Sequence, residues 1–128
     1  YINDKNPKMS RVIGELEELI LLAVCILDGD GYGISVKKEV ERHTSRSILL
    51  GAVHITLYRL QDKGLLESQL GGSSEKRGDR RKRLFRITKK GMEQLRASQE
   101  VRQKMWGLIP QLNPGHDQVA KIGRTPNG

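Results

Sequence analysis

The chain has 128 residues, of which 36% are hydrophobic and 30% are charged, and its formal net charge is +8. This size suits one domain with a modest core that dimerisation would complete. With one cysteine, Cys25, an intramolecular disulfide is excluded and a cytoplasmic location is expected. The longest apolar run, Leu19 to Leu27, is too short to cross a bilayer, and the polar start of the chain does not resemble a signal peptide, so no membrane association is expected.

Three helices are predicted in the first half of the chain. Glu15 to Leu27 has apolar residues at three- and four-residue spacing and a second apolar edge, so this helix must be covered on more than one side. A second helix spans about Gly33 to His43, after the turn sequence DGDG. A third spans about Leu50 to Lys63. The repeat that marks its buried face is Val53, Leu57 and Leu60.

A hairpin and a fourth helix are predicted next. Leu65 to Leu70 is predicted as a strand, and Lys82 to Ile87 as the strand that returns after a loop rich in Gly and Ser. Thr88 is a good N-cap for a helix from about Lys89 to Ile109, which ends before Pro110.

The net charge is concentrated in residues 76–90, KRGDRRKRLFRITKK. This segment holds nine of the 23 basic residues and one of the 15 acidic ones, so the rest of the chain has 14 of each sign and is neutral. Most charge runs are solvated loops, but this one falls on the tip and second strand of the hairpin. The residues expected to neutralise nucleic-acid phosphates are Arg77, Arg80, Arg81, Lys82 and Arg83.

The third helix presents a polar and aromatic face opposite its buried stripe. The candidates for DNA contact on this face are His54, Tyr58 and Arg59, with Thr56 as a further candidate. Arginine can pair with guanine, and a tyrosine hydroxyl commonly reaches a phosphate. The alternative is that Arg59 pairs with Asp62 and that Tyr58 only covers the core.

The order helix-helix-helix-strand-strand-helix predicts a mainly α protein with a small β-hairpin, a winged helix-turn-helix. The last helix is expected to be a C-terminal dimerisation helix, because it carries a coiled-coil-like seam at three- and four-residue spacing: Leu95, Ser98, Val101, Met105 and Leu108. The expected organisation is a flexible N-terminus (1–13), a DNA-binding winged helix (14–88), a dimerisation helix (89–112) and a disordered tail (113–128). The expected function is sequence-specific binding of double-stranded DNA. Two alternatives remain, a winged helix used for protein contact and a non-specific nucleoid-type DNA binder.

Three stretches resemble the PadR family of bacterial winged-helix transcriptional regulators: GELEELILLAVCILDGDGYGISVKKEVE, GAVHITLYRLQDKGLLES and RGDRRKRLFRITKKG. They cover about residues 14–109 and resemble most the short members of the family. The resemblance implies a homodimer that represses nearby genes from pseudo-palindromic sites. It also implies that the first and last helices pack across the two-fold axis. The interface residues are then Leu16, Leu19, Ile20, Val101, Met105 and Leu108.

Several short members of the family bind flat aromatic compounds between their subunits through aromatic residues of the last helix. The resemblance therefore makes Trp106, the only tryptophan, a candidate for binding a planar aromatic effector. The alternative is that Trp106 only anchors the dimer. The chain departs from the family at His54, where Tyr is usual, at Leu49, where the helix is usually capped by Ser, and in the wing at Asp79 and Leu84-Phe85.

No catalytic signature is present in the sequence. It lacks HExxH, CxxC, GxSxG and a Gly-rich phosphate loop, and its three histidines are scattered. We therefore expect no enzyme activity, no cofactor and no metal.

Overall fold

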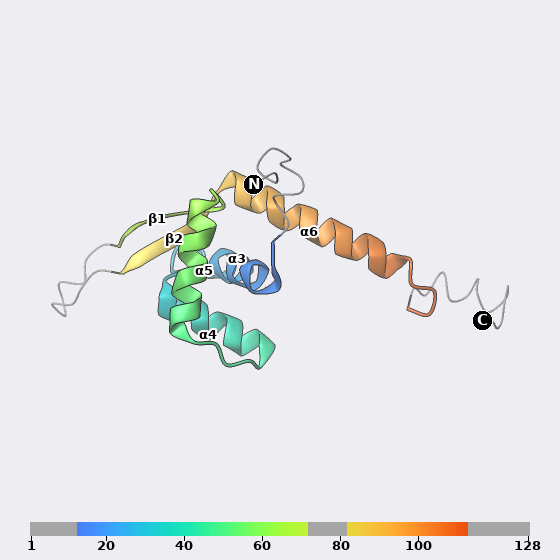
Figure 1. Cartoon of the computed structure of the whole chain (residues 1–128), viewed down its shortest axis with the longest axis horizontal. Coiled ribbons are helices and arrows are strands. Elements are labelled where there is room, and N and C mark those ends of the chain that lie inside the picture. Colours follow the sequence, from blue (N-terminus) through green and yellow to red (C-terminus); the bar gives the residue numbers. More distant parts are fainter. Residues whose placement is uncertain (1–12, 72–81, 113–128) are drawn as a thin grey trace. The chain divides into compact units, whose positions relative to one another are not determined.

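The computed structural model describes residues 13–71 and 82–112. Along the chain these ranges hold α3 (Glu15–Leu27), α4 (Gly33–Thr44), α5 (Leu50–Asp62), β1 (Leu66–Leu70), β2 (Arg83–Ile87) and α6 (Lys89–Gly107) (Figure 1). This order confirms the mainly α winged-helix fold with one hairpin. The expected flexible N-terminus and tail lie outside the described residues, except for Ile13, as do Arg77, Arg80, Arg81 and Asp79 of the wing. The chain divides into two compact units, up to Leu95 and from Arg96 onward.

In the first unit, α5 lies across α3 and α4, and the hairpin extends away from the three helices (Figure 1). The core is apolar and draws on each of these elements. Its fully buried side chains are Ile20, Leu21, Val24, Val36, Val53, Leu57, Leu60 and Leu66. The buried stripe predicted for the third helix is thereby confirmed. Burial raises the pKa of the Cys25 thiol, which packs against this core and so is not a reactive thiolate at neutral pH.

The side of α3 that remains available to a partner differs from the sequence expectation. Ile20 was expected at a subunit interface, but it is 0% exposed because it packs inside its own unit. Leu16 and Leu19 are half-buried against the same core. The apolar side chains that α3 leaves exposed are Leu22 and Ile26, which follow Leu19 by three and seven residues and so lie on the same stripe as Leu19, away from Ile20.

The ends of the elements follow from local hydrogen bonds and glycine conformations. Thr88 caps α6 as predicted, because its Oγ1 accepts the Gly91 N–H at 3.0 Å. At Gly91 an added Cβ would lie 2.2 Å from the Leu65 carbonyl oxygen, so only glycine lets α6 approach the start of β1 this closely. Gly64 follows α5 with a φ of +80°, the left-handed conformation that glycine favours.

The hairpin has a partner that the sequence did not predict. β1 and β2 pair antiparallel, with Leu66 opposite Ile87 and Ser68 opposite Phe85. On the other edge of β2, the Phe85 N–H donates to the Gly31 carbonyl at 2.8 Å. The turn between α3 and α4 therefore holds the second strand of the wing like a short third strand.

Two general properties of the described ranges bear on function. No helix in them is both long and apolar enough to cross a membrane. Within the same ranges, no three His, Cys, Asp or Glu side chains gather as metal ligands would.

Candidate nucleic-acid interface

The outward face of α5 carries three of the four side chains that the sequence nominated. His54, Tyr58 and Arg59 are exposed, on the side of the helix away from the core. The first turn of α5 contains no acidic residue, so the partial positive charge of the helix N-terminus is not cancelled there. This face can therefore approach an anionic surface.

Thr56 does not belong to this face. It is only 4% exposed, and its hydroxyl donates to the Ala52 carbonyl at 2.8 Å within the same helix. The 100° step per residue turns this position inward beside the buried stripe. The expectation that Thr56 contacts DNA is therefore corrected.

Tyr58 links this face to the wing. Its ring meets that of Phe85 on β2 with the centroids 5.6 Å apart and the planes at 76°, which is the edge-to-face geometry that aromatic pairs prefer. Tyr58 is nevertheless 44% exposed. It therefore both covers part of the core and remains open to a ligand on the outward face.

His54 both lies on the outward face of α5 and packs against α4. An added Cβ on Gly33 would lie 2.0 Å from its Nε2, so the imidazole lies against the first residue of α4. The ring fills the space that a side chain at Gly33 would take. A close approach between the two helices of the helix-turn-helix thus depends on a glycine in one and on His54 in the other.

Two described basic residues of the wing, Lys82 and Arg83 at the loop end of β2, make contacts with neighbouring side chains. The Lys82 Nζ lies 4.3 Å from the centroid of the Tyr32 ring, a cation–π contact with the N-cap residue that precedes α4. Arg83 is half-buried, and its Nη1 donates to the Ser68 Oγ at 3.0 Å. Lys82 thus stays exposed, whereas part of the Arg83 guanidinium is engaged inside the hairpin.

Arg59 has an acidic neighbour, although it is not the expected one. Within the described ranges, Arg59 makes no ion pair with Asp62. The nearby carboxylate is that of Glu17 on α3, which is buried and accepts a hydrogen bond from the Lys63 Nζ at 2.9 Å. Burial alone would raise the pKa of Glu17, but the hydrogen bonds from Lys63 and the Gly14 amide, with the charges of Lys63 and Arg59, lower it overall.

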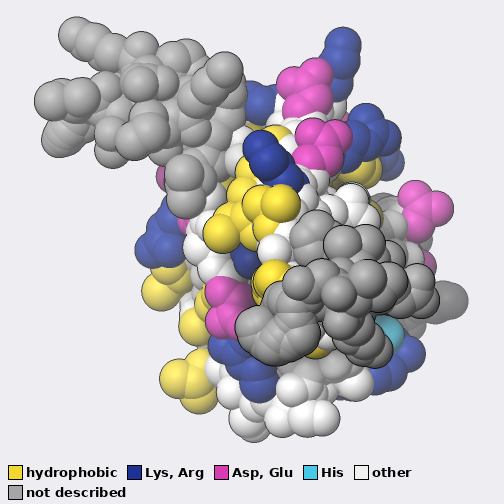
Figure 2. Space-filling model, turned by 90° about the vertical axis from the view of Figure 1, so that its right-hand side faces the viewer, with side chains coloured by type: hydrophobic (Ala, Val, Ile, Leu, Met, Phe, Trp, Pro, Cys, Tyr) yellow, Lys and Arg dark blue, Asp and Glu magenta, His cyan; other side chains and the backbone are white. Residues whose placement is uncertain are grey.

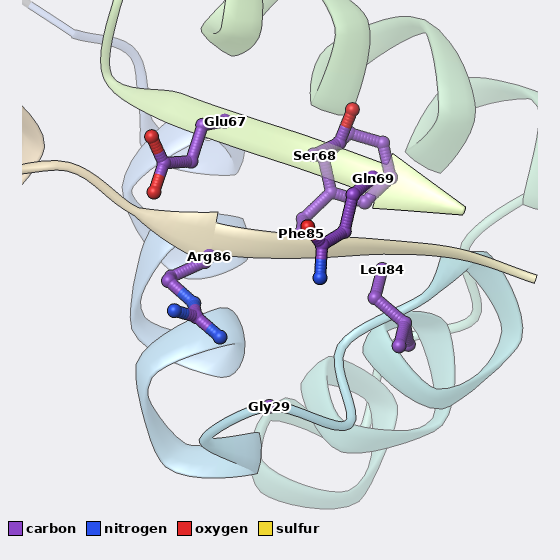
Figure 3. Close-up of a pocket in the computed structure, with 7 residues that line it drawn as sticks. All are labelled: Gly29, Glu67, Ser68, Gln69, Leu84, Phe85 and Arg86. Atoms are coloured by element: carbon purple, nitrogen blue, oxygen red, sulfur yellow. The ribbon is translucent and has the colours of Figure 1, made fainter. Parts of the chain in front are cut away.

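A shallow hollow of about 260 Å³ lies between the hairpin and the turn that carries Gly29 (Figure 3). Leu84 and Arg86 extend toward this turn from β2, and Glu67 and Gln69 line the hollow from β1 (Figure 3). Glu67 stands opposite Arg86 in the strand register, and such opposite charges stabilise a hairpin modestly.

Two members of this surface were not among the residues that the sequence suggested for DNA contact. Ile55 is 60% exposed on the outward face of α5, and Tyr32, the N-cap of α4, contacts Lys82 of the wing. The helical period already placed Ile55 on that face, but an aliphatic side chain carries no charge or hydrogen-bonding group to draw attention to it. The contact of Tyr32 joins residues 50 positions apart, so no local pattern reveals it.

Solved structures of several regulators share this arrangement. A PadR-like transcriptional regulator from Bacillus cereus strain ATCC 14579 is 32% identical over 73% of this chain and 82% of its own, with a TM-score of 0.52. A PadR family regulator from Clostridium difficile R20291 is 25% identical over 73% of this chain and 91% of its own, with a TM-score of 0.52. F93 from STIV, a winged-helix DNA-binding protein, shares the fold at 17% identity and a TM-score of 0.56, over 69% of this chain and 87% of its own.

No curated protein matches the chain by sequence. The model of the transcriptional regulator PadR-like family matches residues 21–97, which is more than half of the chain and includes the helix-turn-helix, the wing and the start of α6. This family consists of DNA-binding regulators rather than enzymes. The chain belongs to the PadR-like family of transcriptional regulators.

Proposed function

We propose that this PadR-family regulator represses transcription as a homodimer bound to a pseudo-palindromic operator. The observation that carries the proposal is the outward face of α5 beside the wing, with Tyr58 joined to Phe85. In winged-helix proteins a recognition helix enters the major groove while the wing contacts the backbone or minor groove. A repressor bound over a promoter excludes other proteins from the same DNA.

On the recognition helix, His54, Tyr58 and Arg59 are the proposed DNA contacts. Arg59 would pair with guanine or a phosphate, and Tyr58 would donate its hydroxyl to a phosphate. The wing residues proposed to contact phosphates are Arg77, Arg80, Arg81, Lys82 and Arg83. Among the wing residues, exposed Lys82 is better placed than Arg83, which is partly engaged by Ser68.

The proposed dimer rests on apolar side chains that a single chain leaves open to water. On α6 and the turn after it, Val101, Met105 and Leu108 are 57%, 63% and 64% exposed, at spacings of four and three residues. Exposed hydrophobic side chains lie among charged ones on the face shown in Figure 2. A stripe of this kind is covered when a second copy packs against it. On α3, Leu22 and Ile26 are further apolar side chains that a second copy would cover.

Trp106 is the residue proposed to meet a planar aromatic effector. It is 60% exposed beside the apolar stripe, as a stacking platform must be, although the same exposure suits a dimer anchor. As the only tryptophan, it reports its own environment by fluorescence. Quenching by planar aromatic cations supports the effector role, and no quenching across a panel leaves Trp106 as an anchor.

The repressor proposal is tested by fluorescence anisotropy with a labelled duplex from upstream of the protein's own gene and a scrambled duplex. We expect roughly 1000-fold tighter binding to the native duplex at about 150 mM salt. Equal binding to both, with a steep salt dependence, would favour a nucleoid-type DNA binder. Absence of binding to any DNA would favour protein contact.

A further inference from the structure

Ile55 stands at the centre of the outward face of α5. At 100° per residue, Gly51 lies 40° to one side of it and Tyr58 lies 60° to the same side, one helical turn before and after. Ile55 is 60% exposed and takes no part in the hydrophobic core. Burying its side chain therefore contributes little to the fold of the single chain.

A single exposed aliphatic side chain is common on protein surfaces and needs no function. The surroundings of Ile55 nevertheless favour a binding role for its side chain. At Gly51, four residues earlier on the same face, an added Cβ would meet nothing within 4 Å. Alanine would stabilise a helix relative to glycine at such an open position. The helix surface therefore has no side chain at Gly51 beside the aliphatic side chain of Ile55. Such a surface suits a flat, partly apolar ligand that comes close to the helix backbone.

We propose that Ile55 contacts the 5-methyl group of a thymine in the operator, and that Gly51 leaves room for the edge of that base pair. This inference rests on the proposed function and names the base that the site selects. Thymine is the only DNA base that presents a methyl group in the major groove, and aliphatic side chains recognise it by contact. The polar neighbours His54 and Arg59 would read the flanking bases.

The proposed contact can be tested by removing one methyl group from the DNA and changing nothing else. An operator is first selected from random duplexes with the full-length protein, and each thymine is then replaced by deoxyuridine. Wild-type protein should bind about fourfold more weakly when the contacted methyl is removed, as expected for one buried methyl-sized group. The Ile55→Ala variant should bind the thymine and uracil duplexes equally at that position.

Ile34→Ala is the matched control, since the same substitution removes a side chain of 45% exposure from α4, at a position where no contact with DNA or with a second copy is proposed. It should keep the fourfold preference for thymine, whatever it does to the overall affinity. Gly51→Ala offers a second test, because it should raise resistance to urea and yet weaken binding of the selected duplex at least threefold. A variant that is more stable and binds less cannot be explained by unfolding.

The outcomes separate the inference from the function on which it rests. Failure to select any sequence would overturn the repressor proposal and the methyl contact with it. Selection of a specific site in which no uracil substitution matters would overturn the methyl contact alone. Continued thymine preference in Ile55→Ala would assign the contact to another residue and also overturn it.

Discussion

The rings of Tyr58 and Phe85 join the recognition helix to the wing. They meet edge to face at 5.6 Å between centroids, and the Phe85 amide is in turn bonded to Gly31 in the turn between α3 and α4. The relative position of α5 and β2 is thus set by an aromatic contact on one side of the strand and a backbone hydrogen bond on its edge. The surface that α5 and β2 together offer to DNA is therefore preorganised.

Two substitutions at Tyr58 separate its ring from its hydroxyl. Tyr58→Ala removes the aromatic pair and should lower the free energy of unfolding by at least about 0.5–1.5 kcal/mol, measured with urea. Tyr58→Phe keeps the ring and should leave stability within about 0.5 kcal/mol while weakening DNA binding, since the side chain can no longer donate a hydrogen bond to a phosphate. Equal DNA affinity for Tyr58→Phe and wild type would show that the hydroxyl does not contact DNA.

The buried carboxylate of Glu17 should make stability depend on pH. Its pKa in the folded protein lies below the ordinary value of 4.5, so ionised Glu17 favours the folded state. The contribution is complete above about pH 4.5 and is lost as the pH falls through the folded value. Glu17→Gln should therefore lower the free energy of unfolding by about 1–2 kcal/mol at pH 7 and by progressively less in acid. Urea unfolding across a pH series measures this difference.

The control for Glu17 is Glu15→Gln, the same change two residues earlier on α3. The Glu15 carboxylate is exposed and pairs with Arg46 at 3.3 Å on the surface. Surface pairs contribute little, so this variant should stay within about 1 kcal/mol of wild type. A pH-independent loss in Glu17→Gln would contradict the assignment to ionisation.

Gly91 should tolerate no side chain. Gly91→Ala places a methyl group 2.2 Å from the backbone oxygen of Leu65, and backbone cannot yield as a flexible side chain would. We expect the free energy of unfolding, measured with urea, to fall by about 1–3 kcal/mol. The same substitution at the open helical position Gly51 should instead stabilise the protein, and two variants of equal stability would count against the close approach.

The apolar stripe of α6 is expected to control assembly. Val101→Glu with Met105→Glu places two charges in the proposed interface, and sedimentation should show the dimer converting to monomer, because these charges would lose their hydration on association. Gln103→Glu adds a charge on the opposite side of the same helix and should leave the dimer intact. A wild-type protein that sediments as a monomer at micromolar concentration would contradict the dimer.

The wing should account for much of the salt dependence of DNA binding. If about six phosphates are neutralised per dimer, the plot of log K against log salt has a slope near −5. Arg80→Ala with Arg81→Ala should flatten this slope by about one for each phosphate that the variant no longer neutralises. Arg96→Ala with Lys104→Ala removes the same charge from α6 and should leave the slope nearly unchanged.

The sequence alone determined the order of the elements, the buried stripe of α5, the cap at Thr88 and the position of the basic wing. These features depend on helical period, capping chemistry and charge, which are local in sequence. The resemblance of three motifs to the PadR family was equally visible and is confirmed by the family match over residues 21–97.

Only the tertiary structure decided which side of the doubly apolar α3 is covered and which residues distant in sequence meet. It buried Ile20 and Thr56, exposed Leu22 and Ile26, and joined Tyr58 to Phe85 across 27 positions of the chain. A helix that is apolar on two sides gives no sign of which side meets its own core, since burial depends on neighbours that are distant in sequence. For the same reason, the close approaches at Gly33 and Gly91 became visible only once two elements were brought together.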